Sequence, residues 1–576
     1  MTETLTLLRQ HGVSELACQF SAYIDRKEQH QHPIIGLTAG LLTEVVTQGH
    51  VCLNLAALPE ILESFSAVLP ASTDEWRALL LKGKTVGKPG DYTPLILTDE
   101  GLLYLYRHWL DERDVALAIR ARMHDVENLN EEQLNQDLAD WDNPNEETDW
   151  QKVAVAMALS RHLAVISGGP GTGKTTIVLK ILQYLHNQSA ELRIGLAAPT
   201  GKAAARLQQS ISEHQQEVKT LHRLLGITEH NDQGRFNAER TLPLDVLIVD
   251  EASMIDISLM AKLLRAMSAR ARLILLGDSQ QLASVESGAV LANLSEGEQG
   301  QFSTEFVDRF PQLGLQPTTS PDAILTDSFV RLQHSYRFDK HSAIGQLARG
   351  VNGGNEEAVV HLLQRDYESA WQSSDERTLL ATLAEGFKAF INAVEAALPA
   401  QEIIQTFEQF RVLAALKQGP QSVMSVNRLM SRFLARQQWP THQMFYQGRP
   451  IMITQNDYRQ KLFNGDIGVI LRDADGKLKG CFYFGDELRW VGLNRLPAHE
   501  TVFAMTVHKC QGSEFDAVSI LLPDEISPIL NRELLYTAIT RARKTATLLS
   551  SEPTLRYTIQ QCHQRESGLK HQLGKR

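Results

Sequence analysis

The sequence has few cysteines, no long apolar run and no excess of positive charge. Its 576 residues include only five cysteines, none of them in a CxxC pair or at a metal-ligand spacing. Scattered, unpaired thiols of this kind are typical of a cytoplasmic protein. No apolar run reaches the length of a membrane span, and the first residues lack the basic and apolar regions of a signal peptide. We therefore expect a cytoplasmic protein with no membrane partner.

The charge balance limits the kinds of nucleic-acid binding that the chain can perform. A formal net charge of −11 argues against a protein that coats nucleic acid nonspecifically. It does not exclude a local basic groove, because a handful of well-placed cations is enough for phosphate contacts. The hydrophobic content of 43% is ordinary for a soluble globular chain, and the length predicts three or four domains.

The most informative stretch is a glycine-rich loop between a strand-like run at 163–166 and a helix-like run at 177–185. It fits the pattern G-x-x-x-x-G-K-[ST]. Glycines let backbone N–H groups surround a phosphate, and the N-terminus of the next helix adds partial positive charge. Lys174 is expected to reach the β- and γ-phosphates of ATP, and Thr175 to hold Mg²⁺. The nucleotide-binding residues predicted here are Gly168, Gly169, Pro170, Gly171, Thr172, Gly173, Lys174, Thr175 and Thr176.

Strand-like and helix-like runs alternate beyond this loop, which predicts an α/β fold with parallel sheets. In such sheets the ligand chemistry gathers at the carboxyl ends of the strands. Asp250 and Glu251 follow the apolar run 244–249 directly. We expect Asp250 to help hold Mg²⁺ and Glu251 to polarise the attacking water. Gln281, in the pattern G-D-x-x-Q, is placed to contact the γ-phosphate.

A second α/β region follows polar junctions near residues 300 and 320. Between about 448 and 497 short β-like runs alternate with turns, which predicts a small inserted β-barrel. Arg337 and Arg541 are candidate arginine fingers, a role worth roughly 10³ to 10⁵ in rate when the guanidinium reaches the transferring phosphoryl group. The neighbouring Arg543 is more typical of a solvated arginine.

Polar loops in both regions suit contacts with phosphate and sugar. His222 and His508 do not belong to a set of residues at a metal-ligand spacing, so we favour polar contacts over a metal site. The candidate DNA-binding residues are Pro199, Thr200, Lys202, Thr220, His222, Thr506, His508 and Lys509.

Nine stretches occur in one order over about four hundred residues: GGPGTGKTT, APTGKAAARL, TLHRLLG, VDEASMID, GDSQQLASV, SYRF, NGDIG, TVHKCQGSEF and YTAITRARK. This set resembles the superfamily 1 DNA helicases, and among them the RecD family of helicase subunits from bacterial RecBCD complexes. The resemblance covers nearly everything from Trp150 onward and is looser before it. One departure is Cys510, where the family pattern leads us to expect a small hydroxyl residue. It would place an oxidisable thiol in a DNA-facing loop.

The resemblance implies an ATP-driven motor that moves 5′ to 3′ on single-stranded DNA. Its partners would be RecB-like and RecC-like subunits of a heterotrimer that acts on duplex ends at double-strand breaks, with any nuclease activity supplied by a partner. By the same resemblance Gln151 would contact adenine, Gln281 would sense the γ-phosphate, and Glu514 would lie near the ribose. Arg337 and Arg541 would act as the fingers.

The predicted fold is thus two RecA-like lobes with parallel sheets, an inserted β-barrel and a small mixed α/β N-terminal domain. The predicted domains are an N-terminal partner-docking domain at 1–120, a first lobe at 121–325 with an acidic linker at 127–149, and a second lobe at 326–576 with the barrel at about 448–497. Two alternatives stay open. One is a free-standing RecD-like helicase, although residues 1–120 do not resemble the helix-hairpin-helix region that such relatives often carry. The other is a nucleotide-binding scaffold without turnover, against which the intact Lys174 and Glu251 argue.

Overall fold

The fold is taken from a computed structural model of the chain. It describes residues 3–58, 64–66, 68–127, 129–141, 148–189, 191–211, 216–228, 230–298, 300–318, 320, 323–338, 342–364, 369–457, 459–484, 487–562 and 564–574. The expected turn at 485–486 and residues 128 and 142–147 of the expected acidic linker lie outside these ranges. None of the helices in the described residues combines the length and the apolar character that crossing a membrane requires.

A small four-stranded sheet organises the N-terminal segment. Its strands are β1 (Cys52–Asn54), β4 (Leu102–Leu105), β3 (Leu95–Leu97) and β2 (Val86–Gly87), in that order. Successive side chains of a strand point to opposite faces. Leu53, Leu95, Leu97 and Leu103 accordingly pack under the helices α1 (Glu3–Gln10), α2 (Glu15–Lys27), α3 (Pro33–Thr47) and α4 (Thr73–Leu80). Cys52, Ile96, Leu102 and Tyr104 pack on the other side, in a core that they share with the next lobe.

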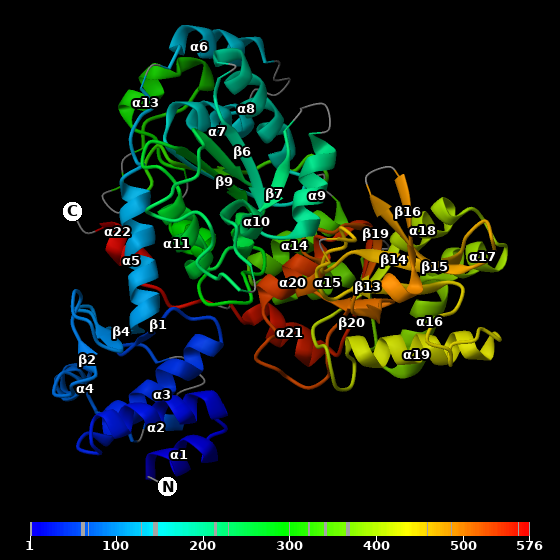
Figure 1. The fold of residues 1–576 in the computed structure, drawn as a ribbon, viewed down its shortest axis with the longest axis horizontal. Helices are drawn as coiled ribbons and strands as arrows, with labels where there is room; N and C mark the ends of the chain where they lie inside the picture. Colours follow the sequence, from blue (N-terminus) through cyan, green and yellow to red (C-terminus); the bar gives the residue numbers. More distant parts are fainter. Residues whose placement is uncertain are drawn as a thin grey trace.

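The helix α5 (Tyr106–Arg120) fastens this segment to the next lobe. It packs along α11 (Ile257–Ala266), where the guanidinium of Arg265 lies 2.8 Å from a carboxylate oxygen of Asp111 and 2.7 Å from one of Asp114. Figure 1 shows α5 running upward from the N-terminal helices along the first lobe. The N-terminal segment is therefore packed onto the first lobe, which corrects the expectation that an acidic linker keeps the two apart.

The first lobe is built on a six-stranded sheet whose pairings are all parallel. Its strand order is β10 (Phe329–Leu332), β5 (Leu163–Gly168), β9 (Arg272–Gly277), β8 (Val246–Val249), β6 (Ile194–Ala198) and β7 (Val218–Thr220). Around it lie α6 (Glu131–Asp140), α7 (Trp150–Ser160), α8 (Lys174–Gln188), α9 (Gly201–Ser210), α10 (Leu221–Leu225), α11, α12 (Val290–Ser295) and α13 (Thr304–Arg309). The predicted α/β fold with parallel sheets is confirmed here.

Two features of this lobe differ from the expected domain limits. The strand β10 pairs with β5, so the sheet of the first lobe crosses the boundary expected between 325 and 326. The helix α6 lies inside the expected acidic linker, and its Leu134 and Leu138 are buried in the core of the lobe. The many acidic residues of this helix predict a solvated linker, although its two leucines are buried.

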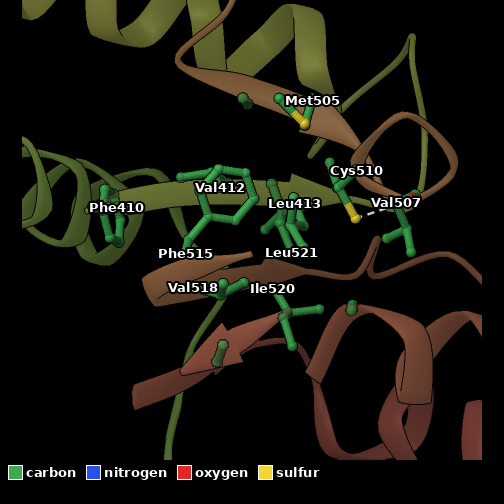
Figure 2. Packing of buried hydrophobic residues seen from close by; sticks show 14 of the residues in the cluster. Phe410, Val412, Leu413, Met505, Val507, Cys510, Phe515, Val518, Ile520 and Leu521 are labelled. Atoms are coloured by element: carbon green, nitrogen blue, oxygen red, sulfur yellow. Dashed lines mark hydrogen bonds between the residues drawn. The ribbon is translucent and has the colours of Figure 1, made fainter. Parts of the chain in front are cut away.

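The second lobe has a five-stranded sheet that is also parallel throughout. Its order is β11 (Ser369–Gln372), β20 (Ala542–Leu549), β19 (Phe515–Leu521), β12 (Phe410–Ala414) and β18 (Ala504–Thr506). The apolar side chains of β12 and β19 interleave in its core, and Cys510 lies at the edge of the same cluster (Figure 2). The helices are α14 (Ala343–Asn352), α15 (Glu356–Leu363), α16 (Glu376–Gly386), α17 (Lys388–Glu395), α18 (Ala400–Glu408), α19 (Val423–Arg436), α20 (Arg532–Ile539) and α21 (Glu552–Gln560).

The insertion in the second lobe is an antiparallel sheet. Its order is β16 (Glu487–Gly492), β15 (Leu478–Phe484), β14 (Ile467–Arg472), β13 (Arg449–Ile453) and β17 (His499–Thr501). Gly465 and Gly476, at two of the predicted turns, have φ values of 96° and 74°, which favour glycine. The antiparallel strands agree with the sequence analysis, whereas their closure into a barrel stays a prediction.

The chain ends in a C-terminal strap, residues 564–574, that leaves the second lobe and returns to the first. Its helix α22 (Leu569–Gly574) packs against α5. The strap surrounds the fully buried carboxylate of Glu112, which accepts hydrogen bonds from Ser567 Oγ at 2.6 Å, Gln572 Nε2 at 2.9 Å and Tyr104 Oη at 2.9 Å. Burial raises the pKa of Glu112 to about 7, even though these hydrogen bonds favour the charged form.

Glu112→Gln should make the protein less sensitive to pH between about 5 and 8. A carboxyl whose pKa is raised on folding stabilises the fold below its unfolded pKa, near 4.5, and this contribution is lost as the pH rises through about 7. The rise of the Glu112 pKa from 4.5 to about 7 changes the free energy of unfolding by roughly 3 kcal/mol at most, because one pKa unit is worth about 1.4 kcal/mol. Thermal melts of both proteins at pH 5.5 and 8 measure this. A difference in Tm that stays the same at both values would contradict it.

Candidate active site

The phosphate-binding loop joins the buried strand β5 to α8, as the sequence predicts. Gly171 and Gly173 have φ values of 77° and 83°, in the left-handed region that glycine adopts without strain. Lys174 Nζ donates to the carbonyls of Gly168, at 2.6 Å, and Gly169, at 3.1 Å. The ammonium is thus held by the backbone of the loop. Gln151, the expected adenine contact, donates from Nε2 to Thr172 O at 3.0 Å.

The carboxyl ends of β8 and β9 bring the expected acid and glutamine to the same edge of the sheet. Burial and, to a smaller extent, the neighbouring Glu251 raise the pKa of Asp250 to about 6, although Lys174 attracts the charged form. Glu251 has a φ of 53°, a conformation that side chains rarely adopt and that is found at functional sites. Gln281 donates from Nε2 to Asp278 Oδ2 at 2.9 Å, and both side chains are buried.

The second lobe forms hydrogen bonds with the segment that carries Gln281. Leu282 N donates to Thr537 Oγ1 at 2.8 Å, and Gln511 Nε2 donates to Leu282 O at 2.6 Å. Tyr536 Oη donates to the same Asp278 oxygen that Gln281 contacts, at 3.0 Å. Side chains of the second lobe thus bond to the backbone of the residue after Gln281, the candidate γ-phosphate sensor, and to the Asp278 carboxylate that Gln281 contacts.

The predicted arginines Arg337 and Arg541 lie near the phosphate-binding loop. Arg337 belongs to a segment that hydrogen-bonds to the loop, since Tyr336 N donates to Gly171 O at 2.8 Å. Its guanidinium lies 2.9 Å from Glu514 Oε1. Arg541 is buried and donates from Nε to Thr537 O at 3.1 Å. Arg543, expected to be solvated, is half exposed, yet it lies 3.3 Å from Glu514 Oε2.

A cavity of about 340 Å³ opens where these groups meet. It is lined by eleven of the predicted site residues, Pro170, Gly171, Gly173, Lys174, Thr175, Asp250, Glu251, Gln281, Arg337, Glu514 and Arg541. The remaining predicted residues of the loop and Gln151 do not line it. Sequence reasoning assigned no site role to Ala203, Arg206, Leu207, Ser210 and Tyr336, which also line it. Arg206 and Tyr336 stand within the stretches APTGKAAARL and SYRF, so a signal for both was present.

The candidate DNA-binding residues have mixed surroundings. The hydroxyls of Thr200 and Thr220 cap the N-termini of α9 and α10, and Thr506 Oγ1 accepts from Lys509 N. His222 is exposed, whereas Pro199, His508 and Lys509 are partly buried. Lys509 Nζ also lies 2.8 Å from Glu500 Oε1. Their role in DNA binding stays a prediction.

Lys202 lies beside the inserted sheet of the second lobe. The neighbouring Gly201 is so close to Phe463 that an added Cβ would lie 3.1 Å from the Phe463 Cβ. Burial lowers the pKa of the Lys202 ammonium to about 8, and Arg411 adds to this effect. The sequence cannot reveal this contact between segments more than 200 residues apart.

Cys510 is a correction to the sequence analysis. The thiol is fully buried and lies 3.0 Å from Val507 O, at the edge of the apolar cluster of the second lobe (Figure 2). Burial raises its pKa to about 11, so the reactive thiolate is scarce at neutral pH. It is a packing residue and does not present an oxidisable thiol to DNA.

Comparison with known proteins assigns the chain to a family. Models of the AAA domain, the UvrD-like helicase C-terminal domain and the N-terminal domain of RecBCD enzyme subunit RecD match residues 151–287, 501–549 and 9–104. The RecBCD enzyme subunit RecD of Haemophilus influenzae is 37% identical over 522 residues, which cover 81% of this chain and 80% of the relative. The chain belongs to the RecD family. It is an ATP-dependent DNA helicase.

Two further relatives show how far the similarity extends within RecD proteins. The RecBCD enzyme subunit RecD of Mycolicibacterium smegmatis is 34% identical over 569 residues, covering 94% of this chain and 93% of the relative. The ATP-dependent RecD2 DNA helicase of Deinococcus radiodurans is 30% identical over 399 residues, covering 68% of this chain and only 48% of the relative. The chain thus matches RecBCD-type RecD subunits over most of its length and covers only about half of the RecD2 helicase.

Glu251→Gln should leave nucleotide binding intact and lower ATP hydrolysis by roughly 10² to 10⁴, the usual contribution of a general base. The substitution keeps the shape of the side chain and removes only the carboxylate that would polarise water. Equilibrium binding and single-turnover hydrolysis, measured on the same preparation, separate the two effects. Loss of nucleotide binding would move Glu251 from catalysis to a structural role.

Proposed function

We propose that this RecD-family chain is a motor that moves 5′ to 3′ along single-stranded DNA in a cytoplasmic heterotrimer with RecB-like and RecC-like subunits. The complex would process duplex ends for the repair of double-strand breaks, and a partner would supply the nuclease activity. The fuel is ATP with Mg²⁺. The polarity and the named partners follow from the resemblance to the family. The ATP-driven motor itself is supported by the cavity between the lobes.

The cavity between the lobes is the observation that carries this proposal. Lys174, Asp250 and Glu251 come from the first lobe, whereas Glu514 and Arg541 come from the second. A nucleotide in this cavity would contact both lobes, so its hydrolysis can change how the lobes sit against each other. Thr175 and Asp250, together with phosphate oxygens, suit Mg²⁺, which prefers few protein ligands and retains water or phosphate in its shell.

The two alternatives receive less support. A scaffold without turnover has no reason to keep Glu251 and two buried or half-buried arginines beside the phosphate-binding loop. A free-standing helicase of the RecD2 kind would not require an N-terminal segment like that of RecBCD subunits, yet residues 9–104 match that domain.

Residues 1–120 are the proposed docking surface for a partner subunit. Twelve large apolar side chains are exposed among the described residues, and six of them lie in this segment. The segment makes up only about a fifth of the chain, so it is enriched in exposed apolar side chains. Leu16 and Tyr23 are 64% and 42% exposed, and their spacing of seven residues places them on one face of α2. An apolar face of this kind suits a protein partner.

Lys174→Gln should abolish ATP hydrolysis, its stimulation by single-stranded DNA and unwinding, while leaving the Tm unchanged within a degree or two. The ammonium acts on phosphate and stabilises no core. Lys180→Gln is the matched control, because Lys180 lies on the same helix with its Nζ 5.3 Å from the centre of the Trp141 ring, outside the cavity. The assays use the assembled complex on duplexes with a 5′ or a 3′ overhang, and the partner subunits without this chain give the background rate.

Two results would contradict the proposal. If the Lys174→Gln protein unwinds DNA at the wild-type rate, Lys174 does not act on the nucleotide phosphates and the loop is wrongly assigned. Movement from the 3′ overhang only would leave the ATPase assignment intact and overturn the proposed polarity.

The double variant Leu16→Glu/Tyr23→Glu should lose co-purification with the partner subunits and keep DNA-stimulated ATPase activity. Two exposed carboxylates cost the fold little, but they are expensive to bury in an interface. Met444→Glu, at a 72% exposed site in the second lobe, is the matched control and should assemble normally. Deletion of residues 1–120 is a poorer test, because it would expose the core shared with the first lobe. Normal assembly of the double variant would move the interface elsewhere.

A further inference from the structure

Glu514 lies at the centre of a cluster of arginines inside the nucleotide cavity. Its Oε1 is 2.9 Å from Arg337 Nη1 and also pairs with Arg206, and its Oε2 is 3.3 Å from Arg543 Nε. The Glu514 side chain is only 7% exposed. Burial alone would raise the pKa of this carboxyl, but Arg206 and Arg337 outweigh burial and lower it to about 2. Glu514 is therefore charged at every pH at which the protein works.

The three arginines come from different parts of the molecule. Arg206 lies on α9 of the first lobe, Arg337 follows β10 beside the phosphate-binding loop, and Arg543 lies on β20 of the second lobe. Arg206 and Arg337 line the cavity, whereas Arg543 does not. One carboxylate thus connects the two lobes across the space that a nucleotide would enter.

Four cations meet in the cavity, and burial makes each of them depend on a compensating partner. Lys174, Arg206, Arg337 and Arg541 all line it. Lys174 donates to two carbonyls of the loop and Arg541 donates to backbone carbonyls, while the other two guanidinium groups share Glu514. Each cation is thus held by a substitute for an anionic ligand. For Arg206 and Arg337 the substitute is one shared carboxylate oxygen, Oε1 of Glu514, which is anionic like a phosphate oxygen.

We propose that Glu514 is a positioning residue that takes the place of the nucleotide phosphates, and that Arg206 and Arg337 exchange Glu514 for the triphosphate when ATP enters. Arg206 becomes an additional nucleotide-contacting residue, supplied by the first lobe. The exchange breaks an ion pair between the lobes only when a triphosphate replaces it, so ATP binding and lobe movement are coupled. This inference rests on the proposed binding of ATP in this cavity.

This role differs measurably from a contact between Glu514 and the ribose. If Glu514 competes with the phosphates, removal of its charge frees two arginines and strengthens nucleotide binding. If Glu514 holds a ribose hydroxyl, the same change weakens binding of ATP, and the loss disappears for a deoxy nucleotide that lacks the hydroxyl. The two models therefore predict opposite signs for the same variant.

The test measures the affinity of a non-hydrolysable ATP analogue, and of its 2′-deoxy and 3′-deoxy forms, by calorimetry on the full-length chain. Glu514→Gln should bind all three roughly threefold to tenfold more tightly than the wild type, because no buried charged pair has to be broken. Asp516→Asn is the matched control. Asp516 lies two residues away and pairs with Lys544 at 2.8 Å and with Arg543 at 4.0 Å, and neither of these cations lines the cavity. Its replacement should therefore leave the affinity unchanged.

Arg206→Gln is the second variant, and because the Arg206 side chain is 42% exposed, its replacement costs the fold little. It should bind the triphosphate analogue about tenfold more weakly and bind AMP as the wild type does, since AMP lacks the phosphates that the guanidinium would reach.

The possible outcomes separate this inference from the proposed function. Unchanged or weaker binding of the analogue by Glu514→Gln, or an Arg206→Gln protein that binds the triphosphate normally, would overturn the exchange. A wild-type protein that binds no ATP analogue at all would instead overturn the proposed function. If Glu514→Gln does not fold, the Arg206→Gln comparison between triphosphate and AMP still decides the matter.

Discussion

The parallel pairing of β5, β9 and β8 is the constraint on which the active site depends. Parallel strands have their carboxyl ends at one edge of the sheet, so residues more than 70 positions apart in the chain come together there. The phosphate-binding loop follows β5, Asp250 and Glu251 follow β8, and Asp278 follows β9. Each strand consists of buried apolar residues, and burial on both faces fixes their register. The polar groups at the strand ends are therefore held rigidly, although the loops that carry them have little core of their own.

The second constraint is electrostatic. A pocket built for a triphosphate must hold several cations close together, and burial makes an uncompensated charge costly. This protein compensates them with backbone carbonyls around Lys174 and Arg541 and with a carboxylate around Arg206 and Arg337. The opposite problem occurs at Asp250, where burial and Glu251 both raise the pKa of the carboxyl. Lys174 also attracts this carboxylate, so positive and negative groups lie close together around one cavity, which suits the binding of phosphate together with a divalent cation.

The sequence was sufficient for the features that depend on local patterns. The glycine-rich loop, the strand-end acid pair and the arginines were predictable because each is a short motif beside a recognisable strand or helix. It was insufficient where distant segments meet. The sequence does not show that Lys202 lies beside the inserted sheet, and Cys510 was expected in a DNA-facing loop, but it fills a core. The C-terminal strap was counted with the second lobe, since nothing in residues 564–574 shows that they pack against α5. Polar composition likewise concealed the two buried leucines of α6.

The strap and the N-terminal segment meet at the loop that follows Gln281. Arg565 donates to the carbonyls of Ser284, at 2.6 Å, Glu286, at 2.8 Å, and Gly288, at 2.9 Å. From the other side, Gly288 N donates to Gly49 O at 2.8 Å. The loop is therefore clasped by two elements that contribute nothing to the cavity. Because the second lobe also grips Leu282, the short segment from Gln281 to Gly288 is the part of the chain at which the nucleotide site, both lobes and the N-terminal segment are all in direct contact. A movement of one lobe against the other would therefore act on a segment that the N-terminal segment also contacts.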